Sequence, residues 1–63
     1  MDDLGMVDFM LSVFEGRAYD GNAVADVLAF EDADVISDDY GVVVRMEHGE
    51  EFQLFVKQTV AAD

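Results

Sequence analysis

The balance of charge is the feature that most constrains how this chain can fold. Fifteen acidic residues stand against three basic ones among 63 residues, which gives a formal net charge of −12. Repulsion between like charges opposes compaction, so a folded state requires a well-formed apolar core. Hydrophobic residues make up 52% of the chain, which is more than acidic disordered segments contain. We therefore expect a single small acidic domain spanning residues 1–63.

The apolar periodicity near the N-terminus predicts a helix over residues 3–15. Asp2 or Asp3 can cap its start, and Gly16 offers a C-terminal stop. Most positions of this segment are apolar, and a helix of that kind must be covered on more than one side. The polar positions recur at helical spacing and form one narrow stripe: Asp8, Ser12 and Glu15.

A second, shorter helix is predicted over residues 23–31. Asn22 is a favourable N-cap for it. Val24, Val27 and Leu28 then lie on one face, at the spacing of an amphipathic helix.

From Ala33 onward the apolar period changes from helical to twofold, which is typical of strands. Residues 42–46 and 52–56 alternate on either side of a three-residue loop at 47–49, and its last residue, Gly49, suits the left-handed position of such loops. This loop fixes a register in which paired residue numbers add to the same value. The expected pairs are Val44 with Phe52, Val42 with Leu54, Arg45 with Glu51, and Val43 with Gln53.

A third strand is expected at residues 33–37, joined to the hairpin by a turn at 38–41. In this register Val35 meets Val44 on the inner face, Asp34 meets Arg45, and Ile36 meets Val43 on the outer face. The predicted fold class is therefore α+β, with two N-terminal helices packed on one face of a three-stranded antiparallel β-meander (ααβββ). Residues 61–63 are expected to form a frayed tail.

The residues do not indicate an enzyme, a cofactor site or a metal site. The only histidine, His48, lies in the predicted hairpin turn, away from any cleft where it could transfer protons. Without cysteine and with one histidine, the usual zinc sites cannot form. We expect a non-enzymatic binding protein.

The acidic surface predicts a basic protein partner, because negative charge attracts cationic faces and repels nucleic acids and membranes. We expect the partner to be a nucleic-acid-binding protein or complex. The candidate partner-binding acids follow the second predicted helix and the hairpin ends: Asp20, Asp26, Glu31, Asp32, Asp38 and Asp39, with Glu47 and Glu50 as a second edge.

A possible self-association surface is expected on the outer sheet face. In the predicted register Ile36, Val43 and Phe55 lie together there with a charged rim. Apolar patches with charged rims are typical of interfaces, so a homodimer is one expectation.

A very small, Asp-rich domain without cysteine and with a single lysine resembles the phage-encoded acidic inhibitors, including DNA-mimic and anti-CRISPR proteins. The resemblance lies in size, charge and compact mixed architecture, and no residue motif carries it. It implies competitive occupation of a basic nucleic-acid channel in the host cytoplasm. Two alternatives stay open. The acidity is also typical of proteins adapted to molar salt, and an interaction or antitoxin-type module would act through the apolar first helix or the outer sheet face.

Overall fold

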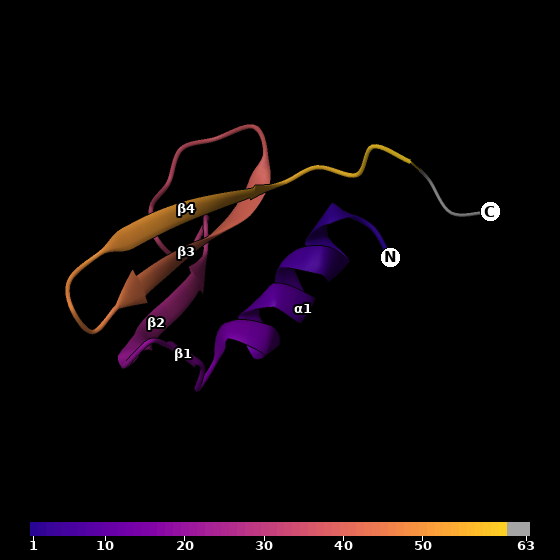
Figure 1. The fold of residues 1–63 in the computed structure, drawn as a ribbon. Helices are drawn as coiled ribbons and strands as arrows, with labels where there is room; N and C mark the ends of the chain where they lie inside the picture. The colour runs from indigo at the N-terminus through magenta and orange to yellow at the C-terminus, as the bar shows by residue number, and fades with distance from the viewer. Residues whose placement is uncertain (61–63) are drawn as a thin grey trace.

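The computed structural model describes residues 1–60 and contains one helix followed by four antiparallel strands (Figure 1). The strands lie in sequence order and form a curled half-barrel sheet, and α1 packs mainly against the middle of it, on β2 and β3. The predicted ααβββ arrangement is therefore wrong. The elements are α1 (Asp3–Phe14), β1 (Ala18–Tyr19), β2 (Asn22–Ala29), β3 (Tyr40–Met46) and β4 (Glu51–Val56).

The first predicted helix is confirmed as α1. Asp2 caps it, because its carboxylate accepts a 2.8 Å hydrogen bond from the backbone N–H of Gly5. After the helix, Gly16 has a φ of 73°, a left-handed conformation that favours glycine. Val7 is the fully buried residue of α1 and joins the main core, which also contains Val42, Val44 and Val56.

The second predicted helix is wrong, since residues 22–29 form β2. A register shift between Val24 and Asp26 marks a β-bulge, which breaks the twofold alternation. As a result Val24, Val27 and Ala29 all pack on the main core. Their spacing of three and then two mimics part of a helical pattern. The bulge therefore explains why a strand has the sequence signature of an amphipathic helix.

Asn22 ties two turns together instead of capping a helix. Its side-chain carbonyl accepts a 3.1 Å hydrogen bond from the backbone N–H of His48, and its amide donates to the Glu50 carboxylate at 3.2 Å. Asn22 follows the tight β1–β2 turn at Asp20 and Gly21, where both residues have positive φ. These contacts fix one end of the sheet.

The predicted register of the last hairpin is confirmed. Val44 pairs with Phe52, Val42 with Leu54, Arg45 with Glu51 and Val43 with Gln53. Gly49 has a φ of 106°, and its N–H donates to the carbonyl of Met46 at 3.0 Å. The sequence therefore determines this loop, because only a residue without a side chain adopts that backbone conformation at little cost.

The strand expected at residues 33–37 is absent, and β2 occupies the place beside β3. The chain turns back directly after β2, since the N–H groups of Ala33 and Val35 both donate to the carbonyl of Phe30. Asp34 follows with a left-handed φ of 59°, which ends extended structure. Consequently Asp26, not Asp34, stands opposite Arg45.

A small second cluster covers the sheet face opposite α1. The rings of Phe30 and Phe55 meet edge to face with centroids 5.0 Å apart, and Phe30 is buried. Gly41 makes room for this ring, because a Cβ there would collide with Phe30 and with the carbonyl of Leu54. Val43, on the same face, is also buried. The tail predicted at 61–63 lies outside the described residues, and no helix within residues 1–60 is long and apolar enough to cross a membrane.

Candidate functional site

The predicted partner-binding acids do not form one continuous surface. One group lies at the end of the sheet that carries the two tight turns, and it comprises Asp20, Glu47 and Glu50. A second group lies in the β2–β3 connection at the opposite end, and it comprises Glu31, Asp32, Asp38 and Asp39. Asp26 lies between them on β2. The fold thus separates acids that the sequence analysis had grouped along a second helix.

Glu50 has a structural role at its end of the sheet. Its own backbone N–H, followed by the amide of Asn22, lowers the pKa of the Glu50 carboxyl below its ordinary value. Both contacts favour the charged form. Glu50 therefore belongs to the hydrogen-bonded link between the two turns.

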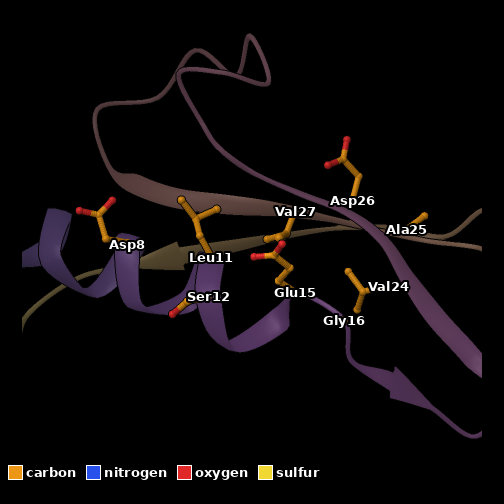
Figure 2. Close-up of a pocket in the computed structure, with 9 residues that line it drawn as sticks. All are labelled: Asp8, Leu11, Ser12, Glu15, Gly16, Val24, Ala25, Asp26 and Val27. Atoms are coloured by element: carbon orange, nitrogen blue, oxygen red, sulfur yellow. The ribbon is translucent and has the colours of Figure 1, made fainter.

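The acids that share a concave surface lie between α1 and β2. Figure 2 shows this groove, which has a volume of about 500 Å³, with Asp8 on α1, Glu15 at the C-cap of α1, and Asp26 on β2 with its carboxylate turned away from the helix. Leu11 and Val27 contribute apolar lining between them. We call this surface the acidic groove; its lining residues are Asp8, Leu11, Ser12, Glu15, Gly16, Val24, Ala25, Asp26 and Val27.

The polar stripe found in the sequence is the helical wall of the acidic groove. Asp8, Ser12 and Glu15 all line it. The Ser12 hydroxyl donates a 2.9 Å hydrogen bond to the carbonyl of Phe9, so it is engaged by the helix backbone. Sequence reasoning had not connected this stripe with Asp26, because it placed Asp26 on a separate helix.

The groove is lined by carboxylates and by no basic side chain. Within residues 1–60, no group of three Asp, Glu, His or Cys side chains is placed to hold a metal ion. His48 lies exposed in the β3–β4 turn, away from the residues that line the groove. In the described chain Glu51 forms the one ion pair, with Arg45 at 2.8 Å, and the hydrogen bond and charge of Glu51 raise the pKa of Arg45. The charge of Asp26, which stands opposite Arg45, also raises that pKa, whereas no basic residue lines the groove beside Asp8 and Glu15.

The self-association patch expected from sequence is not assembled. Val43 is only 2% exposed, because it lies in a central strand with Leu28 beside it on β2. Ile36 is fully exposed in the β2–β3 connection, and Phe55 is half-exposed against Phe30. The three residues therefore do not present one apolar surface. The reason is that β2, rather than residues 33–37, is the neighbour of β3.

A different apolar surface lies on the other side of α1, and the sequence analysis had not located it. A groove of about 460 Å³ runs between the end of α1 and the β4 half of the sheet. No acidic residue lines it. We call it the apolar groove; its lining residues are Val13, Phe14, Arg17, Ala18, Tyr19, Val24, Val44, Met46, Phe52 and Leu54.

Comparison of the chain with protein-family models, with curated proteins and with solved structures gives no match.

Proposed function

We propose that this chain is a non-enzymatic acidic binding protein that occupies a basic, nucleic-acid-binding surface of another protein. The observation that carries the proposal is the acidic groove, in which Asp8 and Glu15 line one concave surface that has no basic residue in its lining. Asp26 also lines it, and its charge is shared with Arg45, which stands opposite it on β3. Folding keeps these like charges on one surface at an electrostatic cost. A cationic partner removes that cost on binding.

The dimensions of the groove suit side chains that project from a partner rather than a small ion. Asp8 lies on α1 and Glu15 is its C-cap, seven residues further along the chain, so the two are separated by about 10 Å along the helix axis. Lys and Arg side chains that normally hold successive phosphates are spread over distances of this order. The apolar lining from Leu11 and Val27 can accept the aliphatic stems of those side chains.

The test is fluorescence anisotropy with a labelled peptide of alternating Lys and Ala, measured from 50 to 300 mM KCl. The triple variant Asp8→Asn, Glu15→Gln and Asp26→Asn removes the groove charges. The matched control Glu31→Gln, Asp32→Asn and Asp38→Asn removes three charges from the β2–β3 connection. With roughly 0.5 kcal/mol for each exposed pair, the groove variant should weaken binding about tenfold and the control much less.

Two outcomes contradict the proposal. Affinity that does not fall with rising salt would exclude charge recognition, since the screening length shortens across this range, from about 10 Å at 0.1 M to about 8 Å at 0.15 M and less at 0.3 M. Equal weakening by both triple variants would show a response to net charge alone, without a defined site.

Adaptation to concentrated salt is the competing explanation for the acidity, and thermal melting separates the two. We expect a cooperative transition, followed by circular dichroism, already at 0.1 M KCl. A chain that folds only in molar KCl would show that the acidic surface serves the solvent, and the groove would then not indicate a partner.

A further inference from the structure

The backbone edge of β4 is open. β4 lies at one end of the strand order, and within residues 1–60 no strand pairs with its outer side. The backbone N–H of Met46 donates to the carbonyl of Glu50, so this pair is hydrogen-bonded. Hydrogen-bonded and non-hydrogen-bonded pairs alternate along an antiparallel ladder, so the backbone groups of Phe52, Leu54 and Val56 point toward β3. The N–H and C=O groups of Gln53 and its odd-numbered neighbours point outward. An open edge of this kind is a template for a further strand.

The apolar groove runs beside this open edge. Phe52 is 54% exposed and Val13 is 39% exposed, although both belong to the face on which the core forms. The exposed stripe of α1 continues through Phe9, which is 54% exposed, and Met6. The open strand edge can be followed in Figure 1, and the apolar groove includes Phe52 and Leu54 of the same strand in its lining.

The chain is short of buried apolar surface. The buried apolar side chains of the described residues are mostly valines, namely Val7, Phe30, Val42, Val43, Val44 and Val56. Domains of this size without disulfides or structural metals commonly gain the missing stability by oligomerisation. The chain has no cysteine, so covalent staples are excluded.

The sequence of β4 is complementary to itself when read antiparallel. Around a twofold axis at Leu54, Glu51 stands opposite Lys57 of a second copy, and Phe52 stands opposite its Val56. Gln53 faces Phe55 of the second copy, and these are the residues whose backbone groups point outward, so the ladder bonds can form. Apolar side chains meet on the core face and opposite charges meet on the other face.

Charge also favours this side of the molecule for contact between two copies. Basic residues lie near β4 on both faces of the sheet: Arg17 lines the apolar groove, Arg45 pairs with Glu51 of β4 on the face opposite α1, and Lys57 directly follows β4. The acidic groove lies on the other side of α1. Two chains of net charge −12 therefore meet with the least repulsion along β4.

We propose that two copies of this chain associate through antiparallel pairing of their β4 edges about a twofold axis at Leu54. Pairing joins the two four-stranded sheets into one continuous sheet. Because such an axis is perpendicular to the sheet, both helices lie on the same face, and the two apolar grooves adjoin across the seam. The second copy covers Phe52, Val13 and the exposed stripe of α1 together.

Disulfide trapping tests the register directly, because the natural chain has no cysteine. In the proposed pairing the two Leu54 residues form a non-hydrogen-bonded pair with Cα atoms about 4.5 Å apart, within the range of a disulfide. Leu54→Cys should cross-link to a covalent dimer on mild oxidation. Phe52→Cys, on the same strand and face, is the matched control, since its copies are separated by about 13 Å and should not cross-link.

The oligomeric state tests the pairing itself. Sedimentation of the natural chain in 0.3 M KCl should show a dimer, and Gln53→Pro should shift it to monomer. Proline at this position removes an outward N–H and leaves the β3 bonds intact. Lys57→Glu and Glu51→Lys should each lose the homodimer, whereas their equimolar mixture should restore a heterodimer with opposite charges at both ends of the seam.

A natural chain that stays monomeric at millimolar concentration would overturn the proposal. Cross-linking of Phe52→Cys in preference to Leu54→Cys would overturn the register. Circular dichroism of each variant distinguishes a lost interface from a lost fold, and the cysteine variants keep the test decisive if a charge variant fails to fold.

Discussion

Replacing Gly41 with alanine tests the corrected fold at its most sensitive point. In the sequence-based fold Gly41 is the last residue of the turn at 38–41, where alanine would meet no packed ring. In the structure Gly41 lies in β3, where a Cβ would collide with the Phe30 ring and with the carbonyl of Leu54. Its φ lies outside the left-handed region, so the expected cost is steric and not conformational.

Overpacking of this kind typically costs about 1–3 kcal/mol. A chain of 63 residues has a free energy of unfolding of about 3–9 kcal/mol, at roughly 0.05–0.15 kcal/mol per residue. A loss of about 2 kcal/mol therefore removes a large part of the stability. It should lower the Tm by roughly 8–16 °C in a domain of this size.

A double-mutant cycle identifies the cause. The atoms that a Cβ at position 41 would strike are the outer ring carbons of Phe30, and Phe30→Leu removes them. The carbonyl of Leu54 remains, so rescue should be partial, with a coupling of about 1 kcal/mol between Gly41→Ala and Phe30→Leu. The assay is thermal and urea unfolding at one protein concentration and one salt concentration, because dimerisation links stability to concentration. Strict additivity of the two substitutions, or an unchanged Tm for Gly41→Ala, would refute the packing of Phe30 on Gly41.

Two further predictions concern the turns and the outer sheet face. Asn22→Ala should raise the pKa of Glu50 toward its ordinary value, although the backbone contact still keeps it below that value, and NMR titration of the Glu50 carboxyl carbon measures the change. Because the pKa of Glu50 is depressed in the folded state, its contribution to stability is present above the ordinary pKa and is lost as the pH falls through the folded pKa. An unchanged pKa in the variant would exclude the Asn22 contact. Val43→Asp should unfold the chain, because a buried charge without a partner costs about 3–5 kcal/mol. The matched control Ile36→Asp should leave the melting curve unchanged, because Ile36 is fully exposed. Equal effects of the two substitutions would contradict the burial of Val43.

The parts of the fold that follow from sequence are those determined by local chemistry. Asp2 caps α1, and Gly49 fixes the loop whose geometry dictates the register of the β3–β4 hairpin. β2 could not be predicted in this way, because its bulge at Ala25 replaces strict alternation with a spacing that also fits a helix. Residues 22–29 form a strand because they pair with β3, and this pairing joins segments that are distant in the sequence.

The candidate site shows the same division between local and long-range information. The stripe of Asp8 and Glu15 was visible at helical spacing, and it forms one wall of the acidic groove. The opposite wall, Asp26, depends on the placement of β2 beside α1. Misassigning β2 also moved Ile36 next to Val43 in the predicted fold, and this error created the apparent patch on the outer sheet face.

The two proposed surfaces are compatible because, among the described residues, Val24 is the only one that lines both grooves. The acidic groove lies between α1 and β2, whereas the apolar groove reaches from the end of α1 to Phe52 and Leu54 of β4. Pairing through β4 therefore leaves both acidic grooves at the outer flanks of the dimer, each available to a cationic surface. Two linked sites bind a target with repeated basic segments more tightly than one site does, without any new contact. Gln53→Pro should then weaken binding to a peptide with two basic segments more than binding to a peptide with one, whereas the charge-neutralised groove variant should weaken binding to both.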